Sequence, residues 1–91
     1  AQFSDPLYKL LDMLALQVEK AKMNLESKTT YVTDLTLQDL ANMCGIPQDQ
    51  QAGSLYSLQS DPHIRMQGSK ITIPDCLELV KDVAFYRRQN H

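Results

Sequence analysis

The chain has 91 residues, 43% of them hydrophobic and 22% charged, and its net charge is −2 at pH 7. This length and composition predict one globular domain with a modest core, and they exclude a disordered chain and a two-domain chain. No apolar run reaches the ~20 residues that span a bilayer. The first residues, AQFSDPLYKLL, have no basic segment followed by an apolar block, so we expect no signal peptide there. Because Cys44 and Cys76 fit neither a disulfide scaffold nor a metal motif, we expect a reducing, cytoplasmic setting and no metal site.

Residues 1–27 predict a leading helix, running from about Pro6 to Ser27. Ser4 or Asp5 is suited to cap it, and Pro6 fits the first turn, where its missing N–H is not needed. An apolar seam follows at alternating steps of four and three residues. The seam consists of Leu7, Leu11, Leu14, Val18, Ala21 and Leu25, with a thinner stripe of Met13, Leu16 and Met23 beside it. Two interpretations stay open: the helix packs only on its own domain, or it also forms a coiled-coil seam in a homodimer.

A connector and a short helix follow. The polar, β-branched residues 28–35 predict a connector with a short strand at Tyr31 and Val32. Thr36 is suited to cap the next helix, and Asp39 stands three residues later, close to a capping box. This helix should end near Cys44.

The next residues predict a tight turn and a second helix. Gly45 supplies the residue that tolerates positive φ where a helix ends, and Pro47 is placed to open a helix that runs to about Gln59. Two short helices joined by a glycine turn, over residues 36–59, are typical of a helix-turn-helix.

The remaining residues predict a hairpin and a closing helix. Residues 60–63 break the preceding helix, and residues 64–73 alternate apolar and polar around a turn that contains Gly68. A last helix over residues 75–88 has an apolar face and ends with two arginines. That face consists of Cys76, Leu79, Val80 and Val83. The fold class predicted for residues 1–91 is therefore a single domain, mainly α with a small β-hairpin wing: a winged helix-turn-helix.

These elements and residues resemble the DNA-binding domain of the cyclic AMP receptor protein (Crp/Fnr-type) family of bacterial transcription regulators. The stretch LTLQDLANMCGI, residues 35–46, is similar to the family's first helix and turn, and the similarity continues without gaps to residue 83. The matching downstream residues are Leu55, Leu58, Ile64, Gly68, Ile71, Ile73, Asp75 and Leu79. The resemblance implies a homodimer that reads a two-fold symmetric site in double-stranded DNA through the second helix.

The resemblance also implies that a small-molecule effector binds a separate N-terminal domain. The chain has no initiator Met and begins like the middle of a protein, so we expect a fragment of a longer chain. No effector site or cofactor is expected within these residues.

The resemblance breaks in the second helix. Gln51 stands where the family has an apolar residue, and Gly53 stands where it has an arginine; a mid-helix glycine costs about 1 kcal/mol relative to alanine. Gln48, Gln50 and Gln51 still carry amides suited to adenine, and Asp49 can accept from a cytosine amino group. Solvated side chains on an exposed helix are an equally open interpretation.

The candidate DNA contacts fall into two sets. The base-facing candidates are Gln48, Asp49, Gln50 and Ser54, and the backbone candidates are Thr36, Gln38, Arg65, Ser69 and Lys70. Between residues 36 and 73 three acids outnumber two bases, which predicts weak non-specific DNA binding with a shallow salt dependence. The alternative function is a degenerate winged helix that serves as a protein-protein interaction module, on the face with Gln50 and Tyr56.

The other polar residues give weaker signals. The chain has no Gly-rich phosphate loop, paired-histidine motif or recognisable nucleophile context, so we expect no enzyme. His63 is interpreted as a surface loop histidine, with a ligand or pH-sensing role as the alternative. Cys44 and Cys76 are interpreted as packed thiols, with a redox pair as the alternative.

Overall fold

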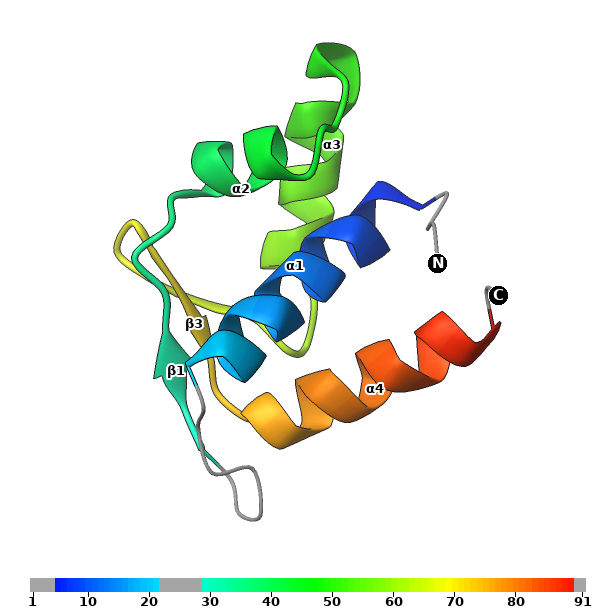
Figure 1. Cartoon of the computed structure of the whole chain (residues 1–91). Helices are drawn as coiled ribbons and strands as arrows, with labels where there is room; N and C mark the ends of the chain where they lie inside the picture. The colour runs from blue at the N-terminus through cyan, green and yellow to red at the C-terminus, as the bar shows by residue number, and fades with distance from the viewer. Residues whose placement is uncertain (1–4, 22–28, 90–91) are drawn as a thin grey trace.

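The computed structural model describes residues 5–21 and 29–89. Within these residues the chain is mainly helical with a small three-stranded antiparallel sheet, and α1 lies between α3 and α4 (Figure 1). The elements are α1 (Pro6–Lys20), β1 (Tyr31–Val32), α2 (Leu37–Met43), α3 (Gln48–Gln59), β2 (Arg65–Gln67), β3 (Lys70–Ile73) and α4 (Cys76–Gln89). These elements agree with the helices, the hairpin and the short strand that the sequence predicts.

Helix α1 forms the centre of the core. Asp5 is its N-cap, because the Asp5 carboxylate accepts a hydrogen bond of 2.9 Å from the backbone N–H of Leu7. The helix ends at Lys20 with Ala21 as C-cap, and the predicted continuation over residues 22–27, with Met23 and Leu25, lies outside the described residues. The buried residues of α1 are Leu10, Leu11, Leu14, Ala15 and Val18.

This burial bears on the predicted dimer seam. Leu11, Leu14 and Val18 are almost fully buried within the single chain, whereas Ala21 is exposed. Between Leu11 and Val18 the seam is therefore covered by the domain's own core, chiefly by α4 and α3 (Figure 1). This part of the seam does not offer a free surface to a second copy.

Helices α2 and α3 are joined as the sequence predicts. The Thr36 hydroxyl accepts from the Asp39 N–H at 3.0 Å and the Asp39 carboxylate accepts from the Thr36 N–H at 3.4 Å, which completes a capping box. Gly45 has φ of +67°, in the left-handed region that ends a helix. Pro47 is the N-cap of α3, which offers no side-chain acceptor to the helix.

The sheet has the order β1-β3-β2 and closes one side of the core. The predicted hairpin is β2–β3, with Gly68 at φ of +62° in its turn, and β1 adds a third strand by pairing Tyr31 with Ile73. The β2–β3 register sets Arg65 opposite Thr72 and Gln67 opposite Lys70. Because side chains alternate along a strand, Arg65 and Lys70 share the outer face of the sheet, opposite the face of buried Ile71.

Helix α4 closes the domain against α1. Its buried residues are Cys76, Leu79 and Val83. Near its end the Arg87 guanidinium pairs with Asp12 of α1 at 2.6 Å and approaches Glu19 at 3.9 Å. Among the helices of residues 5–21 and 29–89, none is long and apolar enough to cross a membrane.

Candidate nucleic-acid interface

Helix α3 has an outward and an inward side. At 100° per residue, Asp49, Gly53 and Tyr56 fall on one side of the helix. All three are exposed, and Tyr56 is 73% exposed. Gln51 and Leu58 lie on the opposite side and are buried. The outward side of α3 is therefore the surface available for a partner, and it carries an acidic and an aromatic side chain.

The four base-facing candidates do not share one direction. Gln48, Asp49 and Gln50 are exposed at the start of α3, where a ligand can reach them. Ser54 is half-buried, and its hydroxyl donates to the Gln50 carbonyl at 2.7 Å. Gln50 and Ser54 also line a shallow groove between α3 and the first residues of α1. Of the four, Asp49 is the residue on the outward side.

The prediction that the Gln51 amide is available to a base is wrong. Gln51 is only 7% exposed, so it cannot present its amide to a base. Its side chain donates to the Ile46 carbonyl at 2.9 Å and to Asn42 at 3.4 Å, and it accepts from Gln38 at 2.7 Å. Gln38 also donates to Asn42 at 3.2 Å. The side-chain amides of Gln38, Asn42 and Gln51 form a hydrogen-bonded group, called here the amide cluster, that joins α3 to α2.

A signal for the amide cluster was present in the sequence. Gln51 stands four and seven residues before Leu55 and Leu58, so it shares their apolar side of the helix. A polar residue at such a position must find hydrogen-bond partners, because a buried unsatisfied amide is destabilising. Gln38 and Asn42, one turn apart on the preceding helix, are such partners.

Of the candidates for contacts to the DNA backbone, two already make hydrogen bonds within the domain and three are exposed. The Thr36 hydroxyl accepts in the capping box, and the Gln38 amide nitrogen belongs to the amide cluster. Arg65, Ser69 and Lys70 are exposed on the β2–β3 hairpin. Among the ion pairs of the described part of the chain, none includes Arg65 or Lys70. The hairpin therefore offers two cations on one face.

Helices α2 and α3 carry negative charge, opposite in sign to the charge of the β2–β3 hairpin. Residues 36–60 contain no lysine and no arginine, and they contain Asp39 and Asp49. Asp39 serves the capping box, which leaves Asp49 as the charge on the outward side of α3. A polyanion is therefore attracted by the hairpin and not by the helices.

The two thiols are packed and protonated. Burial, with a contribution from the nearby Asp12 charge, raises the pKa of Cys44 to about 11, and its Sγ lies 3.5 Å from the Lys9 carbonyl of α1. Burial likewise raises the pKa of Cys76. Both cysteines are free, and a raised pKa makes a thiol less reactive. The interpretation of packed thiols agrees with these surroundings.

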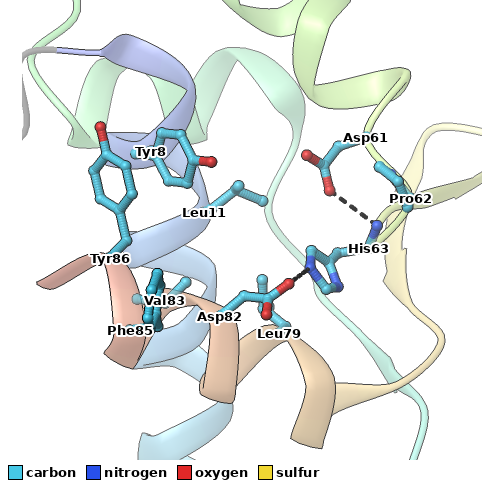
Figure 2. Close-up of a pocket in the computed structure, with 10 residues that line it drawn as sticks. All are labelled: Tyr8, Leu11, Asp61, Pro62, His63, Leu79, Asp82, Val83, Phe85 and Tyr86. Atoms are coloured by element: carbon cyan, nitrogen blue, oxygen red, sulfur yellow. Dashed lines mark hydrogen bonds and ion pairs between the residues drawn. The ribbon is translucent and has the colours of Figure 1, made fainter. Parts of the chain in front are cut away.

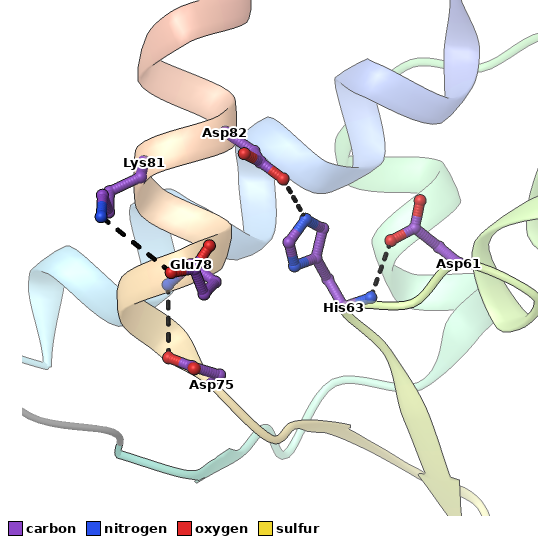
Figure 3. Close-up of polar contacts among 6 residues, drawn as sticks. All are labelled: Asp61, His63, Asp75, Glu78, Lys81 and Asp82. Carbon is purple, nitrogen blue, oxygen red and sulfur yellow. Dashed lines mark hydrogen bonds and ion pairs between the residues drawn. The ribbon is translucent and has the colours of Figure 1, made fainter.

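His63 has a partner that the sequence did not reveal. Its ring is largely buried, and Nε2 lies 2.5 Å from Asp82 Oδ2 of α4 (Figure 3). The Asp61 carboxylate accepts from the backbone N–H of His63 at 2.9 Å, which orders the loop between α3 and β2. His63 is thus fixed against α4, 19 residues further along the chain, and is not a free surface histidine.

Comparison with known families, curated proteins and solved structures found no match. Within the described residues, no group of three or more His, Cys, Asp or Glu side chains is placed to hold a metal ion. The candidate interface consists of the exposed residues at the start of α3, its outward side, and the outer face of the β2–β3 hairpin.

Proposed function

We propose that the chain is a winged helix-turn-helix domain that binds double-stranded DNA, as the output module of a bacterial Crp/Fnr-type transcription regulator. The observation that carries this proposal is the exposure of α3 after the Gly45 turn, together with a hairpin that presents Arg65 and Lys70 on one face, neither of them in an ion pair within the described residues. A polar helix presented in this way fits the major groove, and a basic hairpin fits the phosphates that flank it.

In the proposed complex, the two parts of the interface have separate roles. Gln48 and Gln50 hydrogen-bond to adenine, and Asp49 accepts from a cytosine amino group. Arg65 and Lys70 neutralise phosphates, with Ser69 at the tip of the wing as a further donor. Since only two cations take part, binding is weak without the correct base sequence and depends little on salt.

The assembly that we propose is a cytoplasmic homodimer on a two-fold symmetric site. Because the apolar side of α1 is buried in the domain, the two copies join through another surface. Regulation by a small-molecule effector, which the Crp/Fnr resemblance implies, is assigned to a separate domain.

Selection of duplexes from a random pool, followed by anisotropy titration at low salt, tests the proposal. We expect Gln48→Ala and Asp49→Ala each to relax selectivity at one base pair, by about 1–3 kcal/mol. Lys81→Ala on α4 is the control and should change neither affinity nor selectivity. Lack of binding to every duplex at low salt, with a confirmed dimer, would overturn the proposal.

The second candidate function is a protein-protein interaction module. Tyr56 favours it, because an exposed tyrosine on a helix that carries an aspartate and no lysine or arginine suits a protein partner better than DNA. The structure separates Gln50 from Tyr56, so this candidate predicts a partner protein on the outward side of α3, whose binding Tyr56→Ala abolishes. If Gln48→Ala and Arg65→Ala each weaken DNA binding, and the double variant weakens it by the combined amount, this candidate is excluded.

A further inference from the structure

A cavity of about 330 Å³ lies away from the interface, between α1, α4 and the loop that joins α3 to β2 (Figure 2). Its floor is apolar, because Leu11, Leu79 and Val83 belong to the core and are buried there. The volume is at the lower end of the range for small-molecule sites, which is about 300–1,000 Å³. The cavity therefore has room for a small ligand.

Aromatic rings form one wall of this cavity. The rings of Tyr8 and Tyr86 stack in parallel, with centroids 3.6 Å apart, and join α1 to α4. Phe85 lies next to them and is 58% exposed, although it is the kind of side chain that folding normally buries. The faces of such rings carry partial negative charge and attract cations.

The opposite wall is acidic. Asp61 and Asp82 line it together with His63, as Figure 2 shows, and no lysine or arginine is among the residues that line the cavity. Asp82 remains 63% exposed although His63 contacts one of its oxygens. Arg87, further along α4, is held by Asp12 and Glu19 of α1. Among the described residues that line the cavity, His63 is therefore the one side chain that can pair with a carboxylate as a cation, and it contacts a single oxygen of Asp82.

We propose that this cavity binds a small organic cation, an ammonium group carried on an aromatic body. The ammonium group pairs with Asp82 and Asp61, and the aromatic body packs beside Phe85 over the apolar floor. A charge-assisted hydrogen bond to the carboxylates and a ring-to-ring contact with Phe85 then act on the same ligand. The site is independent of the DNA-binding proposal, since it shares no residue with the outward side of α3 or with the hairpin.

Amide NMR titration of the chain with three matched probes tests this site. Tryptamine is the cation, tryptophol its neutral counterpart and indole-3-acetate its anionic counterpart. We expect tryptamine to shift the signals of residues 61–63 and 79–86 and to bind at least about tenfold more tightly than tryptophol, which equals about 1.4 kcal/mol. Equal affinity for all three probes, or no shift with tryptamine at its solubility limit, would overturn the proposal.

Two variants separate a charge effect from a general loss of structure. Asp82→Asn should reduce tryptamine affinity to that of tryptophol while leaving tryptophol binding unchanged. Phe85→Leu should weaken tryptamine binding several-fold. Its control, Tyr56→Leu, removes an even more exposed ring from α3 and should have no effect. Unchanged tryptamine binding in both Asp82→Asn and Phe85→Leu would contradict the assignment.

Discussion

Helices α1 and α3 are held in the same domain by different forces. Five residues of α1 are buried, and all five are apolar. Only two residues of α3 are buried, and one of them is Gln51, whose amide bonds to α2 and to the turn. Hydrophobic burial is non-directional, whereas an amide cluster fixes an orientation and gains little net free energy. The apolar core therefore stabilises the domain, while hydrogen bonds set the orientation of α3.

The largest effect that this comparison predicts is on the core side. Leu14→Ala on α1 removes a fully buried side chain and should lower the free energy of unfolding by about 2–5 kcal/mol. Urea unfolding followed by circular dichroism measures it. Leu16→Ala, on the less buried stripe of the same helix, is the control with a much smaller expected loss. Equal losses would show that the second stripe is also covered, as a homodimer seam would require.

The second effect concerns Cys44, where α2 meets α1. The pKa of Cys44 is raised from 9.0 to about 11, so the fraction of thiolate at pH 8 falls about a hundredfold. Because the thiolate is the reactive form, the alkylation rate of Cys44 should fall by about the same factor. Since the folded pKa lies above the unfolded one, this thiol stabilises the fold below pH 9 and loses that contribution as the pH rises towards 11. Mass spectrometry after iodoacetamide treatment measures the rate. The same rate in buffer and in urea would contradict the prediction.

The third effect tests the amide cluster directly. Gln51→Ala removes the donor to the Ile46 carbonyl and leaves the Gln38 amide with Asn42 as its remaining partner in the cluster, and it should cost about 1–3 kcal/mol. Hydrogen exchange of the α3 amides should accelerate while that of α1 is retained. Gln50→Ala is the matched control, because Gln50 is exposed and its loss should stay within about 0.5 kcal/mol. Equal costs at both positions would show that the cluster does not hold α3.

The smallest effects have opposite signs at two glycines. Gly53→Ala should stabilise the domain by about 0.5–1 kcal/mol, because Gly53 is helical and an added Cβ meets nothing within 4 Å. Gly45→Ala should destabilise it by about 1 kcal/mol, because φ is +67° there. Thermal unfolding of the two variants checks the signs. Destabilisation by Gly53→Ala would mean that α3 needs its flexibility.

The scaffold could be predicted because its signals are local. A capping pair at Thr36 and Asp39, glycines at the two turns and alternating residues in the hairpin each act within a few residues, so they are readable one at a time. The partner of the short strand at Tyr31 was not predictable, since Ile73 stands 42 residues later in the sequence.

The candidate site was predicted less well, because its features depend on tertiary contacts. Gln51 is buried by a neighbouring helix, and the contact between His63 and Asp82 joins a loop to α4. Exposure of Tyr56 likewise follows from the direction in which the core lies. Residue type alone predicts none of these features. The burial of Gln51 could be predicted from its position on the apolar side of its helix.

We proposed that the β2–β3 hairpin contacts phosphates and that α3 contacts bases. The salt dependence of duplex binding tests these separate roles most directly. Each phosphate contact contributes about 0.9 to the slope of log affinity against log salt, so Arg65→Ala with Lys70→Ala should reduce the slope by about 1.8 for each protomer. Lys81→Ala should leave it unchanged. A slope unaltered by the double substitution would contradict the account, because the hairpin would then not be the part of the domain that meets the phosphates.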